Sequence, residues 1–217
     1  MSHQIAPSIL NADFLKLGEV IHMLNSSEAD LIHLDIMDGV FVPNLSFGFP
    51  IIKQIKSAAA KPLDVHLMIT KPDRYIERFR EAGADTLTVH YEACNDLKSS
   101  LKKISSLGMK ASVSLKPATK VEVLKPYLPL LDMVLIMTVE PGYGGQAFME
   151  SSYERIRELR GMIIEAKTKT LIEVDGGVGK DNLQKLKEAG VDVFVIGTSI
   201  FRAPDPMKMI RELKEMQ

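Results

Sequence analysis

The stretch LIHLDIMDG, residues 31 to 39, decides the fold. Its first seven residues read as a buried strand, yet they include His33 and Asp35, two groups that water solvates well. Side chains alternate across a strand, so both polar residues share one face, while isoleucine and leucine occupy the other. A strand with one face for helices and polar groups near its C-terminal end is typical of a barrel with a site at its mouth.

Two later strands repeat this phase. In LDVHLMI, residues 63 to 69, His66 lies near the C-terminal end, and in TLIEVDGG, residues 170 to 177, Asp175 takes the corresponding place. Because parallel strands end at the same edge of a sheet, we expect three strands to direct their polar side chains toward one mouth. The expected set is His33, Asp35, His66 and Asp175.

The rest of the chain alternates short apolar runs with amphipathic stretches, which is the pattern of βα units around a parallel sheet. Helical stretches at 71–83, 96–108 and 181–190 each end in glycine, a common C-terminal cap. The phrase EAGAD near the end of the first returns as EAGVD near the end of the third, which indicates one helix-to-strand joint used twice. The eight expected strands cover residues 5–10, 31–37, 63–69, 86–90, 110–115, 133–138, 170–174 and 193–196.

Eight such units in 217 residues, without a long polar linker, favour a single α/β domain over residues 1–217, a closed (β/α)8 barrel. The alternative is an open, doubly wound sheet that binds a dinucleotide. The glycine fingerprint G-x-G-x-x-G is missing after the first strand, which weakens that alternative.

Composition narrows the function classes. The net charge is -1, from 27 basic and 28 acidic residues, so no basic surface for nucleic acid or an anionic membrane is expected. The single cysteine, Cys94, provides neither an intrachain disulfide nor a thiolate metal cage and is interpreted as structural. The N-terminal residues MSHQIAPSIL lack the pattern of a signal peptide, and no stretch resembles a membrane span. We expect a cytoplasmic protein that acts on a small soluble molecule.

Two imidazoles and two carboxylates form a donor set that suits a divalent metal such as zinc, iron, manganese or cobalt. The alternative is a group of hydrogen-bonded core residues, but burial of these groups without a counter-charge is costly, which favours the metal. Three further polar residues of the expected strands, Asp64, His90 and Glu173, are interpreted as structural. For His90 we find nothing nearby that would complete a site.

Three glycine-rich segments follow the last three strands: PGYGGQAF at 141–148, DGGVGKDN at 175–182 and GTSIF at 197–201. Glycines let backbone N–H groups approach an anion, and the loops after strands seven and eight are the usual phosphate site of such barrels. One glycine pair alone would indicate a tight turn, but three successive loops favour a phosphate monoester. By the same alternation Met37, Met68 and Met137 point inward. They either form an apolar roof above the reacting carbon or simply fill the core.

Together, the segments IAPSIL, HLDIMDGVFVPN, DVHLM, VEPGYGGQAF, VDGG and GTSIF resemble the ribulose-phosphate 3-epimerase family over nearly the whole chain. The resemblance implies a (β/α)8 barrel of the ribulose-phosphate-binding type. It further implies interconversion of D-ribulose 5-phosphate and D-xylulose 5-phosphate, a reaction of the pentose phosphate pathway, with one divalent metal per subunit.

Carried over to this chain, the resemblance implies that His33, Asp35, His66 and Asp175 bind the metal. Asp35 and Asp175 would also be the catalytic acid and base on opposite faces of the sugar. The residues implied in substrate binding are Ser8, His66, Gly142, Tyr143, Gly144, Gly145, Asp175, Gly176, Gly177, Gly197 and Thr198.

Three alternatives remain at this point. A related 3-epimerase of a hexulose phosphate such as allulose 6-phosphate could use the same residues. Decarboxylase or synthase barrels need an inward lysine at a strand end, and we find none. A catalytically silent sugar-phosphate-binding protein is disfavoured because both proton-transfer carboxylates are present. We also expect a homo-oligomer, although the sequence does not show which face is covered.

Overall fold

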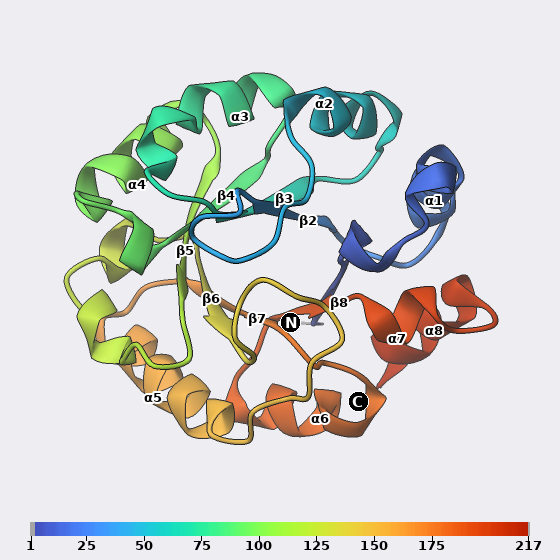
Figure 1. Cartoon of the computed structure of the whole chain (residues 1–217). Helices are drawn as coiled ribbons and strands as arrows, with labels where there is room; N and C mark the ends of the chain where they lie inside the picture. The colour runs from blue at the N-terminus through green and yellow to red at the C-terminus, as the bar shows by residue number, and fades with distance from the viewer. Residues whose placement is uncertain (1–2, 217) are drawn as a thin grey trace.

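Eight parallel strands form the centre of the computed structural model, which describes residues 3–216. Their order is β1-β8-β7-β6-β5-β4-β3-β2, and a parallel bridge between Ser8 and His33 joins the two outer strands. The sheet is thus a nearly closed barrel ringed by helices, as predicted (Figure 1). The strands are β1 Gln4–Pro7, β2 Ile32–Met37, β3 Leu63–Met68, β4 Thr86–His90, β5 Lys110–Leu115, β6 Met133–Met137, β7 Leu171–Asp175 and β8 Val193–Ile196.

Helices follow the strands around the outside of the barrel. The α-helices are α1 Leu17–Ser26, α2 Phe49–Ala58, α3 Ile76–Ala82, α4 Leu97–Ser106, α5 Ser152–Glu165, α6 Lys180–Ala189, α7 Thr198–Phe201 and α8 Pro206–Glu215. The 3-10 helices are η1 Ile9–Asn11, η2 Phe14–Lys16, η3 Pro72–Arg74, η4 Tyr91–Ala93, η5 Val121–Leu124 and η6 Leu128–Leu130.

The repeated joint is confirmed. Helices α3 and α6 both end at a glycine in the left-handed region, Gly83 with φ 106° and Gly190 with φ 112°. In each case the glycine N–H bonds to carbonyls of the last helical turn before the chain enters the next strand.

The structure departs from the expected alternation in two places. Between β5 and β6 the chain forms η5 and η6, because Pro126 and Pro129 lack the N–H that a continuous α-helix needs. The helix expected over 71–83 is divided at Tyr75, whose φ of -120° lies outside the helical region.

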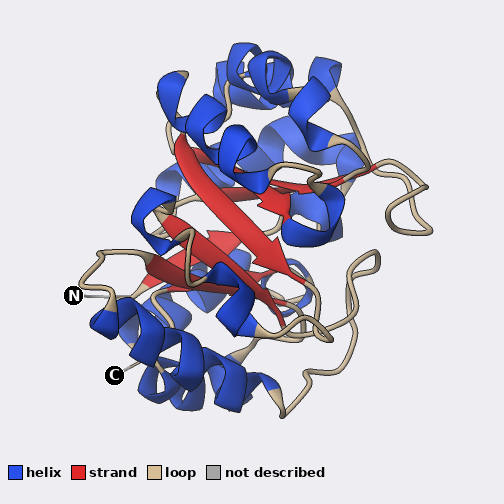
Figure 2. Ribbon diagram, turned by 90° about the vertical axis from the view of Figure 1, so that its left-hand side faces the viewer, coloured by secondary structure: helices blue, strands red, loops and turns tan. Residues whose placement is uncertain are grey.

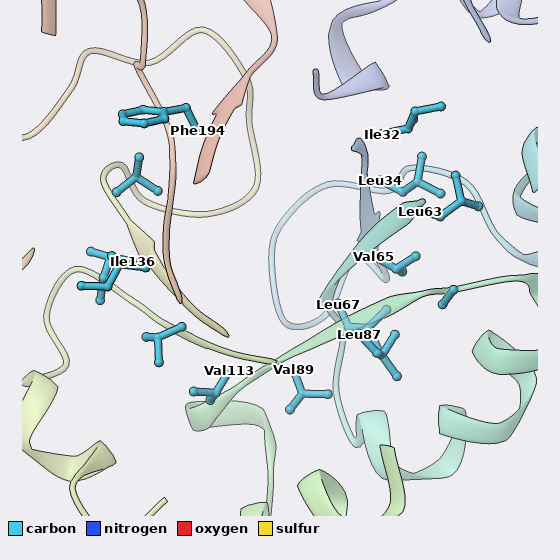
Figure 3. Close-up of a cluster of buried hydrophobic side chains, with 14 of the residues drawn as sticks. Ile32, Leu34, Leu63, Val65, Leu67, Leu87, Val89, Val113, Ile136 and Phe194 are labelled. Atoms are coloured by element: carbon cyan, nitrogen blue, oxygen red, sulfur yellow. The ribbon is translucent and has the colours of Figure 1, made fainter. Parts of the chain in front are cut away.

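The main apolar core lies between the strands and the helices. Side chains such as Leu34, Val65 and Val113 are fully buried, and Figure 3 shows them distributed around the barrel. Burial of each such side chain is worth about 1.5–3 kcal/mol. The largest buried cluster includes residues from Ile5 to Leu213, which supports the proposal of one domain. Residues 1, 2 and 217 of that expected domain lie outside the described part.

The long loops gather at the carboxyl end of the strands. Seen from the side, they project from one end of the barrel (Figure 2), and in Figure 1 the loops after β2 and β6 lie over its mouth. Two hydrogen bonds join these loops, from Asn44 Nδ2 to the Gly142 carbonyl at 3.0 Å and from Tyr143 Oη to the Pro43 carbonyl at 3.2 Å. The fold therefore encloses one end of the barrel.

None of the helices within residues 3–216 has the length and apolar character needed to cross a membrane.

Candidate active site

Four side chains, predicted from three strands, converge at the mouth of the barrel. His33 and Asp35 come from β2, His66 from β3 and Asp175 from the end of β7, and one donor atom from each lies within 4.8 Å of the others. Both histidines are fully buried, Asp35 is 3% exposed, and the Asp175 side chain is 18% exposed. The structure thus brings the whole predicted donor set together, with its most accessible member facing the cavity.

The histidine rings direct one nitrogen each toward the carboxylates. His33 Nε2 lies 3.2 Å from Asp35 Oδ1, and His66 Nδ1 lies 3.0 Å from the same oxygen and 3.9 Å from Asp175 Oδ2. The register of β2 and β3, which pairs Asp35 with His66, produces this arrangement. The other oxygen of Asp35 accepts a hydrogen bond from Ser8 Oγ at 2.7 Å.

The second nitrogen of each ring also has a partner. His33 Nδ1 lies 2.6 Å from Asp64 Oδ2, and His66 Nε2 lies 2.9 Å from His90 Nε2. These contacts correct the interpretation that nothing near His90 completes a site. They give Asp64 and His90 a place directly behind the site, because each contacts a histidine of the donor set.

The buried carboxylates give the site a surplus of negative charge. Burial alone would lower the pKa of His33, but the charges of Asp35 and Asp64 raise it well above its ordinary value. Burial would raise the pKa of Asp35, yet His33 and His66 hold it far below its usual range. For Asp175, burial and then the Asp35 charge raise the pKa to about 6. The two carboxylates are therefore driven apart in acidity, as expected of paired acids that share a positive neighbour.

The donor set fits a divalent transition metal. Two imidazole nitrogens and two carboxylate oxygens are the ligand types that such ions accept, and the surrounding negative charge needs a cation to balance it. The remaining ring nitrogens bond outward to Asp64 and His90, as is usual for histidines that bind metals. The donor types thus agree with the predicted divalent metal, but they do not select among zinc, iron, manganese and cobalt.

Glu173 lies deeper in the barrel, and we keep its interpretation as a structural residue. Both of its carboxyl oxygens are fully buried and have no hydrogen-bond partner within residues 3–216, and one lies 3.9 Å from His33 Nδ1. Burial, followed by the nearby Asp64 charge, raises the pKa of Glu173 well above its ordinary value. A neutral Glu173 is the consequence, because a second buried charge beside Asp64 would be costly.

A cavity of about 290 Å³ opens above this cluster at the barrel mouth. Every residue predicted to bind substrate lines it except His66, which lies beneath it, fully buried. The lining residues from the prediction are Ser8, Gly142, Tyr143, Gly144, Gly145, Asp175, Gly176, Gly177, Gly197 and Thr198.

Three methionines line the same cavity, namely Met37, Met68 and Met137. All three are buried, so their side chains form an apolar wall close to Asp35 rather than exposed surface. They therefore line the cavity and also pack in small buried clusters, Met37 and Met68 with Val42, and Met137 with Leu135 and Val139.

The glycine-rich loops after β6, β7 and β8 meet on one side of the cavity. At Gly177 φ is +65°, and a Cβ would lie 2.5 Å from the Phe148 backbone nitrogen, so only glycine fits without a shift of the loop. Asn182 at the start of α6 fixes this turn by donating from Nδ2 to the Gly177 carbonyl at 2.9 Å. Gly177 is therefore required by the close packing of the loop after β7 against the loop after β6.

Sequence reasoning missed Asn11. Its side chain lines the cavity and lies against Gly144 and Gly197, where an added Cβ at either glycine would collide with it. The available signal was a polar residue in the loop directly after the first strand. That position alone does not show that residues 130 and more positions away pack against it.

The comparisons with known proteins agree with this geometry. A sequence model described as the Ribulose-phosphate 3 epimerase family matches residues 4–201. The ribulose-phosphate 3-epimerase of Bacillus subtilis (strain 168) is 46% identical over 212 residues, which cover 97% of this chain and 98% of that protein. The enzyme of the same name from Aquifex aeolicus (strain VF5) is 42% identical over 212 residues, which cover 98% of this chain and 96% of that protein.

Solved structures share the fold. KGPDC from Streptococcus mutans has a TM-score of 0.75 at 15% identity, with 99% of this chain and 97% of that chain covered. A 3-hexulose-6-phosphate synthase has a TM-score of 0.67 at 21% identity, with 99% and 98% covered. At such low identities these structures show the barrel alone. The family match and the similar relatives establish that this chain is an enzyme of the ribulose-phosphate 3-epimerase family.

Proposed function

We propose that the enzyme interconverts D-ribulose 5-phosphate and D-xylulose 5-phosphate, with one divalent metal held by His33, Asp35, His66 and Asp175. The observation that carries this proposal is the convergence of four donor atoms within 4.8 Å beneath a cavity whose other side consists of glycine-rich loops. When bound, the cation would supply positive charge next to the sugar oxygens on which negative charge develops.

Inversion at C3 needs two proton-transfer groups. One carboxylate takes the C3 proton, the electron pair of the C–H bond forms an enediolate with the neighbouring carbonyl, and the other carboxyl returns a proton to C3 on the opposite face. We assign these roles to Asp35 and Asp175, which exchange them when the reaction runs in reverse. Both carboxyls line the cavity in which the sugar would lie, as groups that transfer protons to and from C3 must.

The rest of the cavity would orient the sugar and exclude water. Backbone N–H groups of the loops after β7 and β8 would hold the phosphate, which places the reacting end of a short sugar above Asp35. Ser8 would keep Asp35 aligned through its 2.7 Å hydrogen bond and contact the substrate. The methionine wall would shield the enediolate from water.

A metal-replete coupled assay tests the substrate. We expect kcat/KM for D-ribulose 5-phosphate to exceed that for D-allulose 6-phosphate at least about tenfold, because the phosphate loops and the acids confine the length of the sugar. A reversed preference would establish the hexulose alternative.

Solvent deuterium exchange tests catalysis itself. In deuterated water, deuterium should enter C3 of the sugar phosphate, since the carboxyls exchange protons with solvent between turnovers. Binding without any exchange would identify a silent sugar-phosphate-binding protein and overturn the proposal.

Two further predictions concern the whole molecule. We propose a cytoplasmic homo-oligomer whose partners are small molecules rather than nucleic acids or membranes, in keeping with the net charge of -1. Leu15 before α1 is 97% exposed and offers apolar surface for association. Sedimentation analysis of the purified chain tests the oligomeric state.

A further inference from the structure

We propose that His90 is a positioning residue, which together with Glu92 fixes His66 in the orientation and tautomer that bind the metal through Nδ1. This inference rests on the proposed metal site and concerns residues outside the four ligands. It assigns a role to the only β4 side chain that touches the donor set among the described contacts.

A line of side chains runs from the site to the loop after β5. His66 Nε2 lies 2.9 Å from His90 Nε2, and His90 Nδ1 lies 3.3 Å from Glu92 Oε2. Glu92 also accepts hydrogen bonds from the Lys116 backbone N–H at 2.9 Å and from the Thr119 hydroxyl. The two histidines occupy successive strands, and the acid lies in η4 directly after β4.

The carboxylate determines the direction of every hydrogen bond in this line. Since Glu92 can only accept while ionised, His90 must carry its proton on Nδ1 and leave Nε2 free to accept. His66 then donates from Nε2, and its Nδ1 is left with a lone pair that faces Asp35 and Asp175. The opposite arrangement would place an unprotonated His90 nitrogen against a carboxylate.

The protonation state of Glu92 agrees with this direction. Burial would raise the pKa of Glu92, but the hydrogen bonds from His90, Thr119 and Lys116 lower it to about 2. An ionised Glu92 is the acceptor that the tautomer argument requires.

Packing holds the ring of His90 in place. It is fully buried, with the His66 ring centroid at 5.0 Å and the Phe41 centroid at 4.8 Å. The ring of Phe41 is itself covered by a cation, because Lys116 Nζ lies 4.0 Å from its centroid. Because both ring nitrogens already have side-chain partners, rotation of His90 would break the line at two points.

His33 provides an internal comparison. Its Nδ1 reaches the buried carboxylate of Asp64 directly, at 2.6 Å. His66 Nε2 has no carboxylate among its partners within residues 3–216, and it reaches one through a second histidine. Both ligands thus have a carboxylate behind them, which is the usual way to orient a metal-bound histidine.

Zinc affinity of the purified full chain, measured by competition with a chromophoric chelator, tests the inference. We expect His90→Phe to weaken binding about 10- to 100-fold, because His66 loses its acceptor. Glu92→Gln should weaken it less, since an amide can still accept one hydrogen bond. The double variant should bind no more weakly than His90→Phe alone, because both changes break the same line.

Ser114→Ala is the matched control. Ser114 pairs with His90 in the β4 and β5 register and is fully buried, but it takes no part in the line. Its zinc affinity should stay at the wild-type value, and circular dichroism should show that all variants are folded. If His90→Phe is unstable, Glu92→Gln alone carries the test.

The outcomes separate this inference from the proposed function. Absence of one zinc equivalent in the wild type would overturn the metal site itself. If the wild type binds zinc and both His90→Phe and Glu92→Gln keep the wild-type zinc affinity, only the positioning role is overturned. Additive losses of zinc affinity in the double variant would overturn it as well. In cobalt-substituted protein, the exchangeable His66 Nε2 proton should give a shifted resonance that exchanges faster with water in Glu92→Gln.

Discussion

The barrel mouth has two unlike regions. The metal corner is defined as His33, Asp35, His66 and Asp175. These side chains come from strands, and the first three of them are almost fully buried. The phosphate corner, which is the loops at 142–145, 176–177 and 197–198, consists of backbone whose glycines allow close approach. Binding at the metal corner would depend on the donor atoms of its side chains, whereas binding at the phosphate corner would depend on the path of the backbone.

This difference has an energetic reason. Buried charges must be paired, so each member of the metal corner has a defined partner, including Asp64 and His90 behind it. A phosphate bound at the rim would keep part of its hydration and would need donors rather than a full counter-charge. We therefore expect changes in the metal corner to lower kcat, and changes in the phosphate corner to raise KM.

The largest effect should follow removal of the metal. Dialysis against a chelator should abolish nearly all turnover, and added zinc, iron, manganese or cobalt should restore it. Binding of inorganic phosphate, measured by calorimetry, should survive in the metal-free protein because the glycine loops remain. Full activity in protein shown to be metal-free would contradict the proposed site.

The next effect separates the acids from the cation. Asp35→Asn and Asp175→Asn should each keep the fold but lower kcat about 10²- to 10⁴-fold, because one face of C3 loses its proton-transfer group. The coupled assay measures kcat, and circular dichroism shows whether each variant keeps the fold. Near-normal turnover in either variant, with metal bound, would show that the two-carboxylate mechanism is wrong.

A smaller effect is expected at the phosphate corner. Gly177→Ala should raise KM about tenfold with little change in kcat, since a left-handed alanine costs about 1–2 kcal/mol and displaces the loop. Gly161→Ala in α5 is the control, because nothing lies within 4 Å of its added Cβ. A loss confined to kcat would show that the two corners are not separable.

The smallest effect concerns stability and the acid behind His66. The folded pKa of Glu92, about 2, lies below the ordinary value of 4.5. Its ionised form therefore stabilises the fold above about pH 4.5, and this contribution disappears as the pH falls toward 2. The stability difference between wild type and Glu92→Gln should rise to about 1–2 kcal/mol by pH 5 and then stay level.

Urea unfolding at a series of pH values provides the measurement for Glu92. The variant difference cancels the titration of groups that do not contact Glu92, because both proteins contain them. A difference that grew with falling pH would contradict the direction of the shift.

The two corners were predictable to different degrees. Strand periodicity alone determined that His33 and Asp35 share a face, because alternation depends only on position along the strand. The same signal identified His66 and Asp175. It also predicted the eight strands, several to within one residue, whereas the prolines after β5 were not recognised as replacing a helix with η5 and η6.

Only the tertiary structure decided which groups stand behind the ligands. Periodicity placed His90 on a face, but the pairing of β3 with β4 brings its ring to His66, and the loop after β5 completes the contacts of Glu92. Likewise, Asn11 meets Gly144 and Gly197 through barrel closure. Side-chain direction is a local property of the backbone, whereas a partner distant in sequence is determined by strand register and packing. That is why the sequence alone identified the four proposed ligands but not the groups behind them.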